Sequence, residues 1–302
     1  VEVGLDVRRL PHDFFYALET ISAGAYAEDP NTCLRPHNAS LVYRITLPCD
    51  YLRDECWGYV GMTDGWILIA FRGTRTKIQL ITELIETMSE PKRKLRSGGS
   101  VQHYFFVALQ SIWKPMHTVI QKLRKVSIMF TGHSLGGALA SLASTVYAHR
   151  HPSRQFRVHL ITYGQPRVGN YEYAESHSRL VRNSWRIVHK YDLVAHLPAC
   201  AFRIFSHSCA SLLNHSPYHH GTEVWFPTNM TQNALFRICD GLPLYEDDSC
   251  SAQHLFLSGD MHDYGSIKPA FIEGNSEEIA VARDYLFIYL FTVRSTSIWT
   301  RQ

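Results

Sequence analysis

The sequence lacks the features that mark several classes of protein. None of its apolar runs approaches the roughly 20 residues that a membrane-spanning helix needs, so no transmembrane segment is expected. It also lacks a strong charge of either sign, because 30 basic residues face 27 acidic ones for a net charge of +3. The basic residues are scattered apart from 92–94 and 122–125, which gives nucleic-acid binding little support. With 45% hydrophobic residues in 302, one ordinary globular domain spanning 1–302 is expected.

The most specific pattern in the chain lies at residues 132–136, which read Gly-His-Ser-Leu-Gly. An apolar run at 126–130 precedes it and a helix-forming run at 138–148 follows it. A G-x-S-x-G pattern between a strand and a helix predicts a nucleophile elbow, a turn tight enough to strain the serine and expose its hydroxyl. Glycines fit there because larger side chains would collide with the neighbouring strand and helix. The alternative for Ser134 is a structural Gly-rich turn.

A second candidate lies at the end of an expected strand, where residues 70–75 read Ala-Phe-Arg-Gly-Thr-Arg. The loop after an early strand supplies the second oxyanion donor in serine hydrolases of this kind, so Thr74 is the candidate donor. An ordinary strand end is the alternative. The following segment, 77–88, predicts an amphipathic helix that is either a lid or a cover for the core. The lid candidates are Ile78, Leu80, Ile81, Leu84, Ile85 and Met88.

Hydrophobic periodicity predicts alternating helices and strands around these motifs. Helices are expected at 13–27, at 103–125 with a bend or division at Pro115, at 171–180 and at 277–293. Strands are expected at 41–46, 57–62, 66–71, 156–163, 184–189 and 222–226. The first three strands enter the sheet antiparallel. The pattern predicts an α/β protein with a mostly parallel central sheet, helices on both faces and a short helical lid.

The acid and base of a serine hydrolase would follow the nucleophile in the chain. Asp192 follows the strand at 184–189, the place where an α/β-hydrolase carries the acid that orients its histidine, and the apolar residues after it would bury the carboxylate. A strand-ending Asp at a turn is the alternative. The order Ser, Asp, His leaves seven candidate bases: His196, His207, His215, His219, His220, His254 and His262. Because neighbours on a strand point to opposite faces, His219 and His220 are not expected to chelate a metal, and no metal or organic cofactor is expected.

Cysteines and glycosylation triplets favour an extracellular or lumenal protein. The close pairs Cys49/Cys56, Cys200/Cys209 and Cys239/Cys250 suit short disulfides and leave Cys33 over. Asn38, Asn214 and Asn229 each begin an N-x-S/T triplet. The chain starts at Val1 without an apolar leader segment, so either a leader has been removed or the start was trimmed. The alternative is a cytosolic protein with seven reduced cysteines.

Four motifs in order, at 71–74, 131–138, 163–170 and 192–198, resemble the class 3 lipase family, the fungal-lipase-like α/β-hydrolases. The likeness covers about 57–265, and the cysteine spacing resembles secreted members of the nematode type. It implies Ser134 as nucleophile, Asp192 as acid, His262 as base, and Thr74 with the backbone of Leu135 as the oxyanion hole. The sequence departs from the family in having one residue, where the family usually has two, between His262 and Tyr264, and His254 is the reserve. Leu80 stands where the family often has a lid tryptophan.

The residues and the resemblance together predict a secreted serine carboxylic ester hydrolase. A triacylglycerol lipase acting at a lipid–water interface is the leading expectation, with acylglycerols or phospholipids as substrates and a monomer as the active form. Phospholipase A1 or soluble-ester, feruloyl-type activity is the alternative. A catalytically silent lipid-binding protein on the same fold is the rival from another class.

Overall fold

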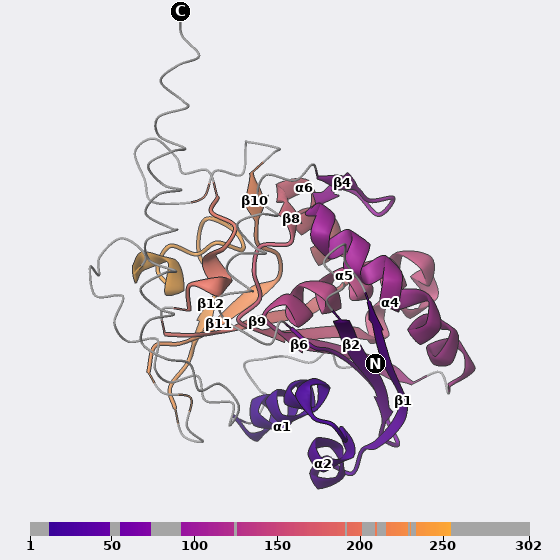
Figure 1. Ribbon diagram of the computed structural model, residues 1–302. Coiled ribbons are helices and arrows are strands. Elements are labelled where there is room, and N and C mark those ends of the chain that lie inside the picture. The colour runs from indigo at the N-terminus through magenta and orange to yellow at the C-terminus, as the bar shows by residue number, and fades with distance from the viewer. Residues whose placement is uncertain are drawn as a thin grey trace, which may run out of the picture.

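An eight-stranded mixed sheet organises the chain (Figure 1). The structure, a computed structural model, describes residues 12–48, 55–73, 92–123, 126–190, 192–200, 209, 216–228, 230 and 234–254. Its main helices are α1 (His12–Ala23), α2 (Asn31–Leu34), α4 (His103–Lys122), α5 (Leu135–Arg150) and α6 (Tyr171–Leu180). Its strands are β1 (Ser40–Pro48), β2 (Glu55–Met62), β3 (Trp66–Phe71), β4 (Arg93–Lys94), β5 (Ser100–Val101), β6 (Ser127–His133), β7 (Val158–Tyr163), β8 (Gly169–Asn170), β9 (Asn183–His189), β10 (Pro217–Tyr218), β11 (Thr222–Phe226) and β12 (Arg237–Cys239). Short 3-10 helices are η2 (Gly24–Tyr26), η3 (Arg35–His37), η4 (Pro152–Arg157), η5 (Val194–His196) and η6 (Ser251–His254).

The strands of the large sheet follow the order β1-β2-β3-β6-β7-β9-β11-β12. The pairs from β3 to β11 are parallel, whereas β1-β2, β2-β3 and β11-β12 are antiparallel. This confirms the predicted antiparallel entry and the mostly parallel centre. Because parallel neighbours end at the same edge, the loops after β6, β7 and β9 meet at one edge of the sheet.

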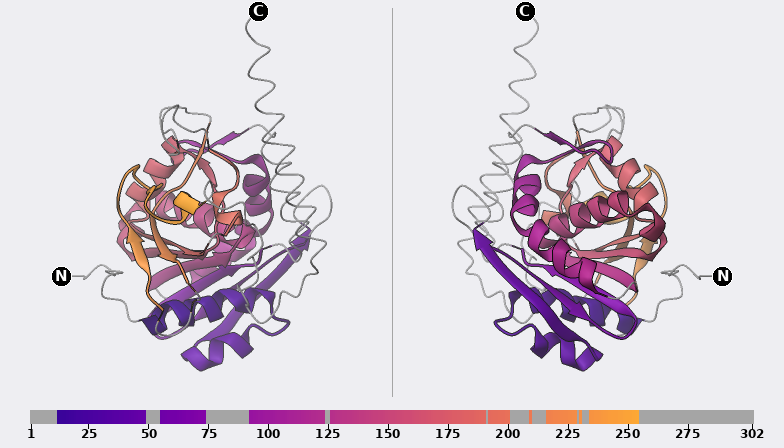
Figure 2. Two further views of the ribbon diagram at one scale, coloured as in Figure 1. Left: turned by 90° about the vertical axis from the view of Figure 1, so that its left-hand side faces the viewer. Right: turned by 90° about the vertical axis from the view of Figure 1, so that its right-hand side faces the viewer.

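Side chains point alternately to the two faces of the sheet along each strand, and each face is covered by its own helices. Ile67, Ile69 and Phe71 of β3 belong to the core beneath α4 and α5, whereas Leu68 and Ala70 belong to the core beneath α1. Figures 1 and 2 show α1 and α2 on one face of the sheet and α4 and α5 on the other. The helices therefore cover both faces, as the periodicity predicts.

The structure differs from the expectation in two elements. The helix α4 continues through Pro115 without division, because its buried face, which includes Ile112, Trp113 and Met116, packs on the sheet on both sides of the proline. A second, four-stranded sheet in the order β10-β8-β5-β4 was not predicted, since strands of two residues carry no readable periodicity. Among the helices that the structure describes, none combines the length and the apolar character needed to cross a bilayer. The predicted helices at 77–88 and 277–293 lie outside the described residues.

Candidate active site

The backbone at Ser134 has the strained conformation of an elbow. Strand β6 ends at His133 and α5 begins at Leu135, leaving Ser134 between them at φ 58° and ψ −126°. A non-glycine residue there costs on the order of 1–3 kcal/mol and persists when its surroundings fix it. The Ser134 N–H donates to the carbonyl of Tyr163 at 2.9 Å, and its own carbonyl accepts from the N–H of Gly137 at 2.9 Å. The end of β7 and the first turn of α5 therefore hold the serine in place.

The two flanking glycines are required by close backbone contacts. A Cβ atom at Gly132 would lie 2.3 Å from the carbonyl oxygen of Gly136. A Cβ atom at Gly136 would lie 2.2 Å from the carbonyl oxygen of Phe71. The predicted collision with the neighbouring strand and helix is confirmed at both positions.

The end of β3 lies directly against the start of α5. A Cβ atom at Gly73 would lie 2.7 Å from the carbonyl oxygen of His133 and 3.4 Å from the amide nitrogen of Leu135. The first N–H groups of a helix have no partner within it and carry its positive dipole end, so the Leu135 amide is available to an anion. Thr74, the residue after Gly73, lies outside the described residues, and so do the six lid candidates.

Asp192 reaches the same edge from the loop after β9. A Cβ atom at Gly164, which follows β7 at φ 53°, would lie 2.4 Å from the Asp192 Oδ2 atom and 3.9 Å from the Cδ2 atom of His133. The carboxylate Oδ1 atom accepts from the N–H of Val194 at 3.0 Å. The predicted acid therefore lies beside the elbow, although its side chain is half-buried rather than buried as we expected.

Three of the seven candidate bases are committed to other contacts or deeply buried. The His219 Nε2 atom is 2.6 Å from the carbonyl of Ala195, and the His220 Nε2 atom is 2.7 Å from the Oγ atom of Ser141. Burial lowers the pKa of His196 to about 3, which makes it a poor base. His219 and His220, although adjacent, thus contact separate partners. No described side chain hydrogen-bonds the Ser134 hydroxyl.

The remaining candidate bases are not placed by the structure. His262, together with His207 and His215, lies outside the described residues. His254 ends η6, and its side chain also lies outside the described set.

Comparison with known proteins identifies the family. The family model for "Lipase (class 3)" matches residues 68–202, which include the elbow and Asp192. The lipase ZK262.3 of Caenorhabditis elegans is 34% identical over 252 residues, covering 78% of this chain and 71% of that protein. The chain belongs to the class 3 lipase family. Membership makes it a carboxylic ester hydrolase.

Other relatives of this class 3 lipase differ in their named activity. Phospholipase A1-Igamma1 of Arabidopsis thaliana is 30% identical over 161 residues, which cover 44% of this chain and 31% of that protein. Among solved structures, lipase II from Rhizopus niveus aligns over 82% of this chain and 90% of its own, with a TM-score of 0.66 and 22% identity. That likeness identifies the α/β-hydrolase fold, as predicted.

The cysteines of this class 3 lipase are partly paired as predicted. The predicted pairs that fall within the described residues are both disulfides, Cys200–Cys209 and Cys239–Cys250. Cys56 is also disulfide-bonded, and its predicted partner Cys49 lies outside the described residues. Cys33 is free.

Glu223 lies near Cys239 and Cys250, and these three residues form a group of potential metal ligands. Because the two sulfur atoms are joined in a disulfide, they offer no thiolate, so we assign no metal there.

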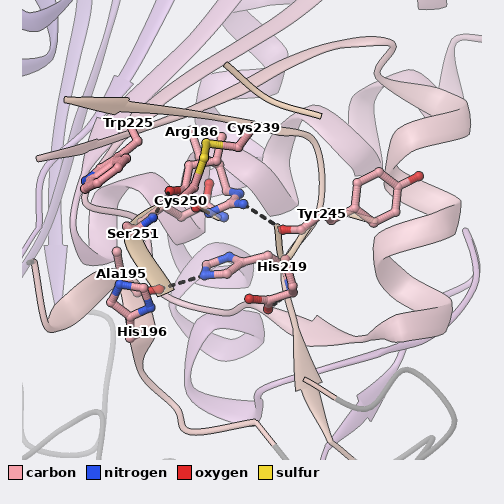
Figure 3. Close-up of polar contacts among 12 residues, drawn as sticks. Arg186, Ala195, His196, His219, Trp225, Cys239, Tyr245, Cys250 and Ser251 are labelled. Carbon is pink, nitrogen blue, oxygen red and sulfur yellow. Dashed lines mark hydrogen bonds and ion pairs between the residues drawn. A yellow bond between two sulfur atoms is a disulfide. The ribbon is translucent and has the colours of Figure 1, made fainter. Parts of the chain in front are cut away.

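A buried charge network next to these disulfides was not predicted. Arg167 pairs with Glu246 at 2.7 Å, and Arg186 lies 3.6 Å from Glu223. Figure 3 shows Arg186 reaching the carbonyl of Tyr245 beside the Cys239–Cys250 disulfide. These partners are separated by tens of residues, so sequence spacing could not have revealed them.

Proposed function

We propose that this class 3 lipase hydrolyses acylglycerol esters through an acyl-enzyme on Ser134. The observation that carries the proposal is the backbone of Ser134, held at φ 58° on an elbow whose neighbouring loops bring Gly73 and Asp192 alongside. A serine is strained in this way when a fold must present its hydroxyl to a reacting group.

The proposed mechanism assigns a role to each predicted residue. His262 takes the proton of Ser134 as the hydroxyl attacks the ester carbonyl, and Asp192 orients the imidazole and stabilises its charged form. The N–H of Leu135 and a donor from Thr74 bind the oxyanion, each contributing on the order of 3 kcal/mol to the transition state. Protonated His262 then releases the alcohol, and water repeats the attack on the acyl-enzyme.

The test compares the wild-type protein with Ser134→Ala on a short-chain triglyceride whose concentration is raised through its solubility limit. A rate that increases sharply when droplets form, and is lost in the variant, supports an interfacial lipase with residues 78–88 as its lid. Smooth saturation below the limit, again lost in the variant, indicates an esterase with an open site. Equal rates for both proteins contradict the proposal and favour a silent lipid-binding protein.

Phospholipase A1 activity is the second candidate, favoured by the 30% identity to an Arabidopsis thaliana phospholipase A1. Parallel assays on a triglyceride and on a diacyl phosphatidylcholine in mixed micelles separate the two. Release of the sn-1 fatty acid from the phospholipid at the higher kcat/KM would make this the better assignment.

The proposal includes that the protein is secreted. The disulfides suit an oxidising compartment, and Asn38, the first residue of a glycosylation triplet, is exposed. Asn214 and Asn229 lie outside the described residues. We expect a monomeric, single-domain enzyme that loses mass on treatment with an N-glycosidase, with a smaller loss for Asn38→Gln.

A further inference from the structure

The hydroxyl of Tyr26 lies between two parts of the proposed site. Tyr26 ends the 3-10 helix η2, just after α1, far in sequence from the elbow. Its Oη atom accepts from the N–H of Gly73 at 3.0 Å and lies 3.1 Å from the Nδ1 atom of His133. One hydroxyl therefore connects the end of β3 with the residue before Ser134.

The two side chains that share this contact are both neutral. Burial raises the pKa of Tyr26 to about 12 and lowers that of His133 to about 4, so both are neutral near pH 7. The Oη atom accepts from the Gly73 N–H through one lone pair, which leaves its proton and its second lone pair for His133. A hydroxyl and a neutral imidazole can each donate or accept, so the Oη and Nδ1 atoms share one hydrogen bond.

The backbone at Gly73 is confined by the same groups. A Cβ atom there would lie 2.6 Å from the Tyr26 Oη atom and 2.7 Å from the carbonyl oxygen of His133. The glycine is thus confined between the tyrosine and the elbow. The amide nitrogen of Leu135 also lies near Gly73, 3.4 Å from the same Cβ position.

We propose that Tyr26 is a positioning residue for the oxyanion hole, because its hydroxyl holds Gly73, at the end of β3, at a fixed distance from the elbow that carries the Leu135 amide. The inference rests on the proposed function of Ser134. Loss of the hydroxyl frees the Gly73 N–H and the His133 Nδ1 atom from their common partner. The end of β3 and the Leu135 amide at the start of α5 are then no longer held at a fixed spacing. A donor displaced by a fraction of an ångström weakens binding of the transition state more than binding of the substrate.

The test is Tyr26→Phe with Tyr59→Phe as the matched control. The Tyr59 hydroxyl donates to the carbonyl of Ile21 in α1, so it holds the same N-terminal segment to the sheet without reaching the elbow. On a soluble p-nitrophenyl ester, we expect Tyr26→Phe to lower kcat by about tenfold, less than the loss of a whole donor, with KM nearly unchanged. Binding of an alkyl boronic acid, which forms a tetrahedral adduct on serine, should weaken by a similar factor. Tyr59→Phe should leave both quantities near the wild-type values.

The outcomes separate the two proposals. If the wild type is active, Ser134→Ala is inactive and Tyr26→Phe matches Tyr59→Phe, the positioning role is wrong while the proposed function stands. If the wild type itself shows no Ser134-dependent hydrolysis, the proposed function fails and the positioning role fails with it. Should Tyr26→Phe not fold, His133→Gln removes the Nδ1 atom, the partner of the hydroxyl at the other end of the contact. A wild-type kcat in that variant would overturn the inference.

Discussion

At the scale of single residues, backbone contacts leave no room at the elbow. The carbonyl of Phe71 lies 2.2 Å from the position of a Cβ atom at Gly136, a separation that folded proteins do not show. A methyl group there must push β3 away from α5, and overpacking of this kind typically costs about 1–3 kcal/mol. The same displacement would carry Gly73 away from the Leu135 amide, so the substitution should lower both the stability of the fold and the rate of catalysis.

We therefore expect Gly136→Ala to lower the free energy of unfolding by about 3 kcal/mol and kcat by about a hundredfold. Urea unfolding and ester hydrolysis measure the two effects. Gly65→Ala is the matched control, because a Cβ atom at Gly65 would meet nothing within 4 Å. Equal free energies of unfolding for the two variants would contradict the prediction, because the elbow would then accommodate the methyl group without loss of stability.

Residue-scale prediction from the sequence succeeded where a motif carries the chemistry. The G-x-S-x-G pattern predicted the strained turn at Ser134, which the structure has, whereas the catalytic roles of Ser134 and Asp192 stay predictions. Tyr26 belongs to no such pattern, since its proposed role comes from a fold that brings η2 against the ends of β3 and β6, which are distant in sequence. Contacts of that kind follow from tertiary packing and are not encoded in local spacing.

At the scale of elements, one arginine connects three loops near the proposed acid. Arg167 donates from Nε and Nη2 to the carboxylate of Glu246 at 2.7 and 2.9 Å. It also donates to the carbonyls of His196 and Pro198, in the loop that begins at Asp192. The loop of the acid is thereby tied to the loop closed by the Cys239–Cys250 disulfide.

Removing one charge of this buried pair leaves the other without compensation. We expect Glu246→Gln to lower the free energy of unfolding by about 3 kcal/mol, because breaking buried ion pairs costs about 3–5 kcal/mol and the amide keeps part of the hydrogen bonding. Glu28→Gln, which neutralises an exposed carboxylate, should change stability by less than about 0.5 kcal/mol. Chemical denaturation of both variants with intact disulfides tests this. A Glu246→Gln variant as stable as the wild type would mean that the pair does not hold the loops.

The elements themselves could be predicted where their periodicity is long. The helix expected at 171–180 and the strand expected at 222–226 match α6 and β11 in both bounds. The small sheet of β4, β5, β8 and β10 could not be predicted, because its two-residue strands are defined by their partners. Of the bend or division expected at Pro115, the division is excluded, because tertiary packing of α4 outweighs the missing backbone hydrogen bond.

At the scale of the whole molecule, buried neutral histidines couple folding to pH. Burial lowers the pKa of His177 to about 3 and that of His196 to about 3, and it holds the pKa values of His219 and His220 well below the ordinary value. An unfolded histidine titrates near 6.5. Below that pH the unfolded chain binds protons that the folded chain does not, so stability is complete above about pH 6.5 and falls as the pH drops toward the folded pKa values.

Each such histidine adds about 1.4 kcal/mol per pH unit to the slope of the free energy of unfolding below about pH 6. His196 offers a clean test, because its ring nitrogens have no hydrogen-bond partner among the described residues. His196→Leu removes the ionisable group without losing a ring hydrogen bond, so the variant should be at least as stable as the wild type near neutral pH and lose stability less steeply in acid. Urea unfolding between about pH 7.5 and 4.5 measures the slopes, with His149→Gln controlling for removal of an exposed imidazole. Identical slopes for His196→Leu and the wild type would mean that His196 takes up its proton in the folded protein, and the acid sensitivity would then have to come from carboxylates.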